Sequence, residues 1–352
     1  MSGLAETRAL AENPAKTGSK ASSVTKRLRI GFLGVGWIGR HRMEAMLATG
    51  LADAVAIADP SAEMLDAALA VAPEAQQAHD LDNLLTHDLD GLVIATPSAA
   101  HAAQSIEALK RGVPVFCQKP LGPSAAEVEA VVEAARQNDL LLGVDLSYRQ
   151  TDGMQRIKAL LDEQALGETF AADLVFHNAY GPDKPWFYDR SLSGGGCVID
   201  LGVHLVDLAL WSLGFPEVDE VSSTLLSKGR PVGPDSDEVE DYAVANLTLK
   251  GGAVVRIACS WRLQAGTEAI IQASFYGTQG GASLQNVDGS FYKLTADRFL
   301  GTSTESLAGL QEDWGGFAAA AWIRQLAQDP GFDPDCEHLV QSAKVLDRIY
   351  GR

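Results

Sequence analysis

A histidine and two acidic residues stand at helical spacing near the middle of this 352-residue chain. A glycine turn over residues 194–196 precedes a predicted helix over 197–214, on which Asp200, His204 and Asp207 occupy positions i, i+4 and i+7. Burying polar groups along an otherwise apolar helix is costly unless they are paired or functional. Because histidine transfers protons readily near neutral pH, the pattern predicts a proton-transfer site. The same three side chains could ligate a metal, but no further His or Cys cluster stands nearby in the sequence, and we expect no metal.

A glycine-rich turn near the start of the chain has the spacing of a dinucleotide-binding loop. Residues 34–39 read Gly-Val-Gly-Trp-Ile-Gly and lie between a strand-length apolar run and a predicted helix over 37–49. The first glycine permits a tight turn, the second lets a pyrophosphate approach the backbone and the helix N-terminus, and the third packs helix against strand. A turn in which glycine merely redirects the chain is the alternative. The residues assigned to the cofactor are Gly34, Gly36, Trp37, Ile38 and Gly39.

Asp59 ends the second predicted strand, over 54–59, and indicates which dinucleotide is bound. Its carboxylate can accept hydrogen bonds from a ribose 2′-hydroxyl and would repel a 2′-phosphate. Residues 60–66 contain no Lys or Arg that could neutralise such a phosphate. We therefore expect NAD as the cofactor, with NADP less favoured. A helix N-cap or a turn carboxylate is the alternative role for Asp59.

Further cofactor contacts are expected at the carboxyl edge of the predicted sheet, where doubly wound folds bind ligands. Thr96 and Ser98 follow the apolar run 91–95, and either could touch the cofactor, although a helix cap explains Ser98 equally well. His101, within the first turn of the next helix, either lines the cleft or is a partly exposed helix residue.

Lys119 follows the predicted strand 113–117 and is expected to point into the crevice beside the nicotinamide. A cation there would stabilise developing alkoxide charge and lower the pKa of a bound alcohol. A solvated surface lysine is the alternative reading of this position.

The elements that must position these residues change in character near residue 150. Before it, short apolar runs alternate with helical stretches, which predicts a parallel, doubly wound sheet. In addition to the elements above, the first half contains predicted helices over 61–72 (capped by Ser61), 99–112 and 123–139 and predicted strands over 28–34 and 140–145.

The second half predicts an α+β domain. Consecutive extended runs separated by turn residues indicate an antiparallel sheet. The predicted strands are 168–178, 220–228, 240–250, 252–261 and 268–277, and the predicted helices are 153–166, 315–328 and 336–350. The expected domains are thus a tail over 1–27, a dinucleotide-binding domain over 28–150 and a substrate and oligomerisation domain over 151–352, whose last helix is free to pack back on the first domain.

Composition excludes several classes of partner. The formal net charge is −18, so neither nucleic acid nor an anionic membrane is expected, since both need a basic face. The four cysteines are too far apart for a CxxC pair and are expected to be buried thiols of a reducing compartment. We find no apolar run of membrane-spanning length and no signal-like h-region in the first 27 residues, so a cytoplasmic protein is expected.

The motifs together resemble one known family. The chain is similar to the glucose-fructose oxidoreductase, inositol dehydrogenase and rhizopine-catabolism (Gfo/Idh/MocA) family in the glycine loop at 34–39, the Lys-Pro at 119–120 and the Gly-Gly-Gly-Cys-Val-Ile-Asp-Leu-Gly-Val-His run at 194–204. The segment 88–122 also resembles the family's central block. The resemblance spans about residues 28–350 and is specific for the family but not for a substrate.

The resemblance implies a fold and a reaction. The fold class is α/β, with an N-terminal Rossmann doubly wound parallel sheet and a C-terminal α+β domain built on an open, mostly antiparallel sheet that often forms subunit contacts. The implied catalytic set is Lys119, Asp200 and His204, and the Lys119–Pro120 peptide is expected to be cis. The implied chemistry is reversible hydride transfer between a nicotinamide and a carbinol of a sugar, polyol or cyclitol.

One residue departs from the family pattern. The family usually has Glu-Lys-Pro, whereas this chain has Gln118 before Lys119, which retains hydrogen bonding but loses a charge. Gln118 and Lys119 are both counted among the expected cofactor contacts. Restoring the family residue with Gln118→Glu is expected to have a mild effect.

By the same resemblance, the loop over 177–191 is expected to face the nicotinamide from the second domain. Aromatic rings suit sugar faces, and its polar groups could hold hydroxyls or an anionic group, although packing is an alternative role for the aromatics. The candidate substrate residues are Tyr148, Arg149, His177, Tyr180, Trp186, Asp189 and Arg190, beside the aromatic Phe187 and Tyr188.

The leading functional hypothesis is an NAD-dependent oxidoreductase acting on a sugar, polyol or cyclitol. Two alternatives remain: a glycoside-cleaving or epimerising enzyme that retains its NAD, and a non-catalytic NAD-dependent regulator. Strand alternation places Val255, Ile257, Cys259, Ile271, Ala273 and Phe275 on a covered face. The opposite face is mixed in character, and a homodimer or homotetramer is expected to form through it.

Overall fold

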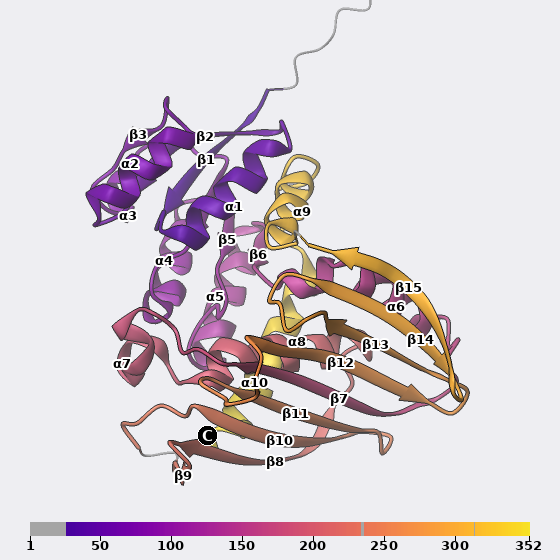
Figure 1. Ribbon diagram of the computed structural model, residues 1–352. Coiled ribbons are helices and arrows are strands. Elements are labelled where there is room, and N and C mark those ends of the chain that lie inside the picture. Colours follow the sequence, from indigo (N-terminus) through magenta and orange to yellow (C-terminus); the bar gives the residue numbers. More distant parts are fainter. Residues whose placement is uncertain (1–25, 234–235, 313) are drawn as a thin grey trace, which may run out of the picture.

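The computed structural model describes residues 26–233, 236–312 and 314–352 and is built on two β-sheets (Figure 1). The predicted tail over 1–27 lies almost entirely outside the described residues. Each sheet is associated with one half of the chain, so the change in pattern near residue 150 corresponds to a change of sheet. The division into domains at that residue stays a prediction.

The first sheet is parallel, as the alternation of strands and helices predicts. Its strand order is β3-β2-β1-β4-β5-β6. The chain first adds strands on one side of β1 and then, from β4, on the other side. Ligands bind at this switch point in doubly wound sheets. The strands are β1 (Leu28–Leu33), β2 (Ala52–Ala58), β3 (Gln76–Gln77), β4 (Gly91–Ile94), β5 (Val115–Cys117) and β6 (Leu142–Val144). The helices between them are α1 (Trp37–Ala48), α2 (Ala62–Val71), α3 (Leu81–Leu84), α4 (Ser98–Lys110) and α5 (Ala125–Asn138).

Local chemistry explains where several of these helices begin. Ser61 caps α2 as predicted, because its hydroxyl accepts a hydrogen bond from the backbone N–H of Met64. Ser124 caps α5 in the same way through the N–H of Glu127. These short-range interactions fix the helix starts, and the apolar strands, buried on both faces, form the core between the helices.

The second sheet has nine strands and is mostly antiparallel, as predicted. β7 (Thr169–Asn178) lies between β11 (Val254–Ser260) and β12 (Ala269–Gly277), parallel to β11 and antiparallel to β12. The predicted antiparallel sheet therefore contains one parallel pair, β7 with β11, because the earlier strand β7 lies between β11 and β12. The full order is β15-β14-β13-β12-β7-β11-β10-β8-β9.

The prediction also missed several strands. β13 (Gly281–Asn286), β14 (Leu294–Leu300) and β15 (Ser303–Gln311) extend the sheet past β12. Their sequences, such as Ser-Thr-Glu-Ser-Leu-Ala-Gly-Leu-Gln in β15, lack a regular apolar alternation. The remaining strands are β8 (Val218–Ser227), β9 (Arg230–Pro231) and β10 (Tyr242–Leu249).

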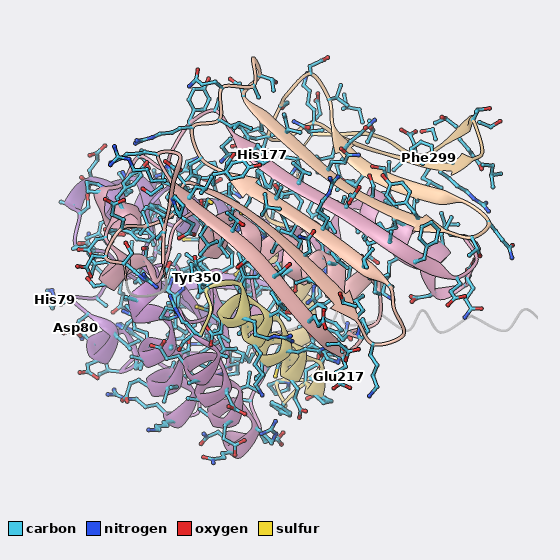
Figure 2. All side chains as sticks on the ribbon, turned by 90° about the horizontal axis from the view of Figure 1, so that it is seen from below. His79, Asp80, His177, Glu217, Phe299 and Tyr350 are labelled. Atoms are coloured by element: carbon cyan, nitrogen blue, oxygen red, sulfur yellow. The ribbon has the colours of Figure 1, made fainter. Side chains whose placement is uncertain are left out.

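One face of the second sheet is covered by helices, including α6 (Asp152–Asp162) and α8 (Val203–Ser212), and the other is open (Figures 1 and 2). The alternation prediction for the covered face is confirmed. The inward residues are at most 4% exposed: Val255, Ile257, Cys259, Ile271, Ala273 and Phe275. Val254 and Tyr276 on the open face are 50% and 37% exposed.

The last two helices return to the first half of the chain. α9 (Phe317–Leu326) packs beside α1, and α10 (His338–Ile349) contacts both α5 and α8 (Figure 1). The Trp322 ring of α9 lies so close to Gly91 and Gly143 that a Cβ at either position would collide with it. The C-terminal residues therefore contribute to the cores around both sheets.

One helical stretch, Arg190–Ser212, is long and apolar enough to cross a membrane by length and composition. Within the structure, 83% of its most apolar window is buried in protein, which is typical of a core helix. It includes the short helix α7 (Arg190–Ser193) and continues through α8.

Candidate active site

The glycine turn has the geometry that its sequence predicts. Gly34 adopts φ +85°, and a Cβ there would lie 2.5 Å from the carbonyl oxygen of Ala95. A Cβ on Gly39 would overlap the carbonyl oxygen of Gly34, whereas a Cβ on Gly36 would meet nothing within 4 Å. The space beside Gly36 fits the pyrophosphate of a dinucleotide, next to the first amides of α1. Trp37 and Ile38 follow on the surface, 56% and 37% exposed.

Asp59 stands at the carboxyl end of β2 and braces this turn. Its carboxylate accepts hydrogen bonds from the backbone N–H groups of Val35 and Ser61, both at 2.9 Å. The turn-carboxylate role is therefore present, while the N-cap of α2 is Ser61 rather than Asp59. Since a carboxylate has about four lone-pair sites, these two bonds leave acceptor capacity for a ribose hydroxyl.

The residues after β4 are more deeply packed than predicted. The Thr96 hydroxyl bonds Gln104, and Ser98 is the first, buried residue of α4 with no side-chain cap bond, so the cap interpretation of Ser98 is wrong. His101 is 1% exposed, which rules out the partly exposed alternative. Its ring nitrogens lie 2.6 and 2.7 Å from the carbonyl oxygens of Pro120 and Thr96, so it ties together the loops after β4 and β5.

Lys119 and Asp200 meet across 81 residues of sequence. The Lys119–Pro120 peptide is cis, as the resemblance implies, and Nζ of Lys119 lies 2.7 Å from Oδ1 of Asp200 and 2.7 Å from its carbonyl oxygen. The lysine side chain is only 20% exposed, so it is not a solvated surface lysine. Nε1 of Trp261 donates to Oδ2 of Asp200 at 3.0 Å, so both carboxylate oxygens have partners.

The helix that carries Asp200 is not the single regular helix that the sequence predicts. Val198–Gly202 forms a π-helical turn, and the regular helix α8 starts only at Val203. π-Turns inside helices are rare and occur frequently at functional sites. Asp200 lies within this turn, and its backbone carbonyl accepts a hydrogen bond from Lys119 in addition to the side-chain ion pair.

His204 lies in the first turn of α8 against aromatic rings. Its imidazole centroid is 5.1 Å from that of Tyr148, in an edge arrangement, and 6.5 Å from that of Phe176. Burial lowers the pKa of His204 well below 6.5, and the positive charges of Lys119 and Arg42 lower it further. The imidazole is therefore neutral at pH 7, the state in which it can accept a proton.

Asp207 and Arg149 form a buried pair of their own. Nε and Nη2 of Arg149 both donate to the Asp207 carboxylate, with the Nε–Oδ2 distance at 2.7 Å. The cation also lies over the rings of Trp211 and Phe215. Burial raises the pKa of Asp207 against the opposing effect of Arg149. Arg149 is thus held by the protein itself. Within the described ranges, no group of three His, Cys, Asp or Glu side chains could hold a metal ion.

Glu240, which the sequence reasoning missed, fixes the start of the helical stretch that carries Asp200 and His204. Its Oε1 accepts hydrogen bonds from the N–H groups of Gly196 and Val198, both at 2.9 Å, and from the Tyr350 hydroxyl at 2.8 Å. Its backbone carbonyl accepts from the N–H of Cys197. Burial raises the pKa of Glu240, and the hydrogen bonds oppose that rise.

Glu240 also explains why three glycines precede the helix. A Cβ on Gly196 would overlap the Glu240 backbone, and one on Gly195 would overlap the Tyr350 hydroxyl. Gly194 adopts φ +84°, which favours glycine. No spacing in the sequence connects these positions, because Glu240 is 44 residues after Gly196.

The candidate substrate residues occupy varied positions around this site. Nδ1 of His177 lies 2.7 Å from the Ser260 hydroxyl, while Tyr180 is 58% exposed. Asp189 caps α7 by accepting from the N–H of Ser191, and Arg190 donates to the carbonyl of Ser236. The cap bond to Ser191 gives Asp189 a structural role.

Aromatic residues gather beside Asp200. Trp186 stacks on Phe187 at 3.8 Å between centroids, and the Tyr188 ring meets the edge of Trp261 at 5.6 Å. Tyr148 is 5% exposed and lies between His204 and Trp314. Trp261 and Trp314 were not among the predicted site residues.

Comparison with known families matches both halves of the chain. Residues 28–146 match the model of an oxidoreductase family with an NAD-binding Rossmann fold, and residues 154–283 match the GFO/IDH/MocA C-terminal domain. The chain belongs to the GFO/IDH/MocA oxidoreductase family. The resemblance inferred from the motifs is therefore confirmed, and so is the fold class.

Relatives of this GFO/IDH/MocA protein cover most of its length. D-glucoside 3-dehydrogenase of Escherichia coli is 25% identical, covering 75% of this chain and 79% of its own. Inositol 2-dehydrogenase of Acidiphilium cryptum is 29% identical, covering 73% and 74%. A solved structure of levoglucosan dehydrogenase with NADH and levoglucosan superposes with a TM-score of 0.80 at 20% identity, covering 93% of this chain and 97% of that one, which establishes the fold.

Proposed function

We propose that this GFO/IDH/MocA oxidoreductase transfers a hydride between NAD and a carbinol of a sugar, polyol or cyclitol. The observation that carries the proposal is the contact between Lys119 and Asp200 near a neutral His204. A cation and a neutral base are the two groups that oxidation of an alcohol needs from the protein. Family membership and the dehydrogenase relatives agree with this chemistry.

The protein's residues have separate roles in the proposed oxidation. Bound NAD would supply the acceptor for the hydride of the carbinol carbon. The hydroxyl proton passes to the imidazole of His204, which is neutral because of its burial. Lys119 stabilises the negative charge that develops on the oxygen. Asp200 holds Lys119 in place through its carboxylate and carbonyl oxygens.

The cofactor residues are proposed from the same geometry. Gly34, Gly36 and Gly39 form the pyrophosphate turn, and Asp59 accepts from the ribose while it braces Val35. The remaining proposed cofactor contacts are Trp37, Ile38, Thr96, Ser98, His101, Gln118 and Lys119.

The proposed substrate contacts lie on the second half of the chain. The exposed ring of Tyr180 and the paired rings of Trp186 and Phe187 provide apolar surfaces of the kind that sugar rings pack against. His177, hydrogen-bonded to Ser260, is the proposed partner of a substrate hydroxyl.

A substrate panel tests the proposal. Purified protein is incubated with NAD and with individual sugars, inositols, anhydrosugars and sugar acids, and formation of reduced nicotinamide is followed by absorbance. Net reduction with at least one polyol or sugar is expected. Substrate conversion without net reduction would identify a cofactor-retaining enzyme instead, and cofactor binding without any turnover would identify a regulator.

Cofactor preference follows from Asp59. Its carboxylate is expected to make NAD binding at least about tenfold tighter than NADP binding, which corresponds to about 1.4 kcal/mol. Asp59→Ala should narrow that gap, and because it also removes the acceptor for Val35 it should weaken binding of both cofactors. Titration of both cofactors by fluorescence measures the ratio, and equal wild-type affinities would contradict the assignment.

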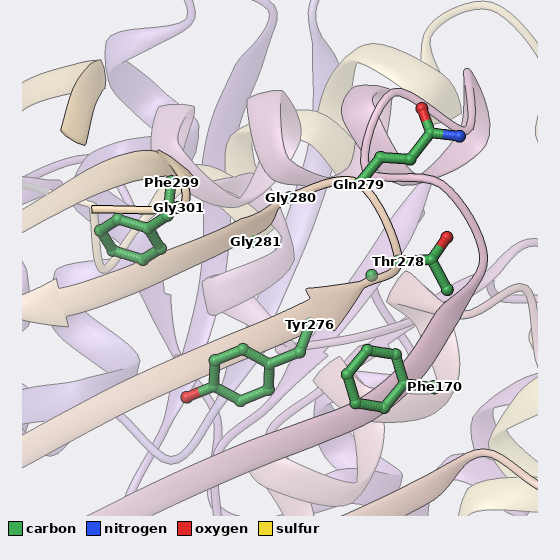
Figure 3. Close-up of a pocket in the computed structure, with 9 residues that line it drawn as sticks. Phe170, Tyr276, Thr278, Gln279, Gly280, Gly281, Phe299 and Gly301 are labelled. Atoms are coloured by element: carbon green, nitrogen blue, oxygen red, sulfur yellow. The ribbon is translucent and has the colours of Figure 1, made fainter. Parts of the chain in front are cut away.

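The open face of the second sheet is the proposed surface for a homodimer or homotetramer. Figure 2 looks onto this face, and Figure 3 shows a depression at one end of it lined by Phe170, Tyr276 and Phe299. Phe170 and Val254 are 53% and 50% exposed, and Val254 and Tyr276 lie in register on either side of Ala171, so exposed apolar groups gather on this face as they do at interaction sites. From the composition and motifs we also propose a cytoplasmic location without nucleic-acid or membrane partners. We propose domains over 28–150 and 151–352 on the same grounds.

A further inference from the structure

Asp145 is a buried carboxylate that the proposed reaction does not use. It follows β6 at the carboxyl edge of the first sheet and is 2% exposed. Nε of Arg42 donates to its Oδ2 at 2.6 Å, and Nε2 of Gln118 donates to the same oxygen at 2.5 Å. The Ser147 hydroxyl donates to Oδ1. Every one of these side-chain partners is a donor, as a buried carboxylate requires.

The three donors come from the three segments that form the site. Arg42 belongs to α1, the helix that follows the glycine turn. Gln118 directly precedes Lys119, and Ser147 directly precedes Tyr148, whose ring packs against His204. Asp145 therefore connects the cofactor helix, the lysine loop and the aromatic residue beside the proposed base.

The negative charge of Asp145 is balanced by the positive charge of Arg42, its ion-pair partner. The guanidinium is 7% exposed and also contacts Nδ1 of His41 at 2.9 Å, and its positive charge reaches His204. Cys117 on β5 also faces Asp145, and burial raises the pKa of this thiol to about 12, so it stays neutral. Without Asp145, Arg42 would be a buried charge with no counter-ion, next to the proposed base.

We propose that Asp145 is a positioning residue of the dehydrogenase site, which neutralises Arg42 and, through the Gln118 amide, holds the loop that carries Lys119. This inference rests on the proposed function. The proposed role requires a hydrogen-bond donor at position 118, because Oδ2 of Asp145 accepts a hydrogen bond from that side chain. A glutamate at 118 would place a second carboxylate within hydrogen-bond distance of Asp145, so the expectation of a mild effect for Gln118→Glu is replaced by its opposite.

A charge-exchange set of variants tests the inference without any substrate. The set is Gln118→Glu, Asp145→Asn and the double variant, with Asp53→Asn as the control, since Asp53 forms an exposed pair with Arg27 on the first sheet. In Gln118→Glu, two adjacent carboxylates share one proton, so one of the two pKa values rises above that of the unfolded chain. The stability difference from wild type is then small near pH 4 and grows as the pH rises through the raised pKa.

Thermal unfolding from pH 4.5 to 8.5 measures this difference. The Tm of Gln118→Glu should fall progressively behind wild type as the pH rises, whereas Asp145→Asn should be lower at every pH because Arg42 loses its partner. The double variant restores one carboxylate and one amide and should recover most of the loss at high pH. If Gln118→Glu follows the wild-type curve at all pH values, or if the double variant is no more stable than the two singles, the inference is wrong.

Activity separates a positioning role from a purely structural one. Gln118→Glu should have a lower kcat than wild type at pH 8.5. This deficit should shrink by about tenfold as the pH is lowered to 6, because the shared proton restores a donor beside Asp145. At pH 8.5 the double variant should regain a large part of the kcat that Gln118→Glu loses, because an amide and a carboxylate again face each other. A deficit that does not change with pH would overturn the positioning role. If wild type oxidises no sugar or polyol, the proposed function fails, while the unfolding curves still decide the role of Asp145.

If Gln118→Glu does not fold, Asp145→Asn and the double variant decide the question. A double variant that folds where the single Gln118→Glu does not supports the charge pairing. A double variant that is less stable than Asp145→Asn contradicts it.

Discussion

At the scale of single residues, two charged or basic side chains determine the proposed chemistry. Lys119 is held by two oxygens of Asp200, which keeps its ammonium group at one position. His204 is kept neutral by burial and by nearby cations. Neither residue is needed to hold the pyrophosphate, which the glycine turn is proposed to bind, so the loss of either should leave NAD binding nearly unchanged.

Lys119→Ala is expected to lower kcat by roughly 10² to 10³, because one electrostatic donor of this kind stabilises a transition state by about 2.7–4 kcal/mol. His204→Ala is expected to have an effect of the same order. The Kd for NAD should be nearly unchanged in both. Lys250→Ala is the matched control, since Lys250 is an exposed lysine paired with Glu217. Retention of more than half of wild-type turnover by both site variants would show that the proton path lies elsewhere.

The depressed pKa of His204 predicts a particular pH dependence. The base works when neutral, so kcat/KM for oxidation should not decline because of His204 until the pH falls below 6.5. In the same range the unfolded chain binds more protons than the native state, so the free energy of unfolding should also decrease as the pH drops below 6.5. Kinetics and denaturant titrations from pH 5 to 8 measure both effects. An acid limb centred at or above 6.5 would contradict the assignment of His204 as the base.

At the scale of elements, the turn before α8 is the feature that brings Asp200 to Lys119. The π-turn over Val198–Gly202 and the three glycines before it form a backbone that regular helix periodicity does not describe. Glu240 fixes this backbone by accepting from two of its N–H groups and from Tyr350. A buried carboxylate at this helix start is also favoured by the helix dipole.

Glu240→Gln is expected to lower the free energy of unfolding by about 1–3 kcal/mol, because hydrogen bonds to a charged acceptor are stronger than those to an amide. It should also lower kcat, since Asp200 lies two residues beyond the bonded N–H of Val198. The control is Glu238→Gln, at an exposed position in the same connection. Denaturant unfolding and steady-state kinetics test the two effects, and a variant equal to the control in both would remove Glu240 from the site.

At the scale of the whole molecule, the two sheets differ in how they are covered. The first is parallel and has helices on both faces, whereas the second leaves one broad face open (Figures 1 and 2). Exposed apolar side chains on the open face include Val254 and Tyr276, and Phe170 lines the depression at its end. Burying such surface is favourable by about 25 cal/mol per Å², which provides a physical reason for association through this face.

Light scattering at micromolar concentration is expected to give a mass at least twice the chain mass of 37.3 kDa. Val254→Glu and Tyr276→Glu should shift the protein towards the monomer, because each would bury a charge without a partner at the interface. Lys110→Glu, on α4 away from the second sheet, is the control. A strictly monomeric wild type would disprove association through the open face.

The parts of the structure that the sequence predicted are those set by local interactions. The strand and helix alternation of the first half, the Ser61 cap and the three roles of the turn glycines depend on neighbouring residues and on backbone sterics. The alternation of β11 and β12 likewise predicted which side chains are buried. The motifs also named Lys119 and Asp200, which the fold brings into contact.

The remaining features arise from contacts between residues far apart in the chain. β7 is inserted between β11 and β12, Arg149 pairs with Asp207 58 residues later, and Arg42 pairs with Asp145 103 residues later. No periodicity encodes such partners, because each depends on where both sheets place their edges. Only the tertiary structure decides whether a polar side chain is paired or left to act on a substrate, since that depends on which donors and acceptors reach it once water is excluded.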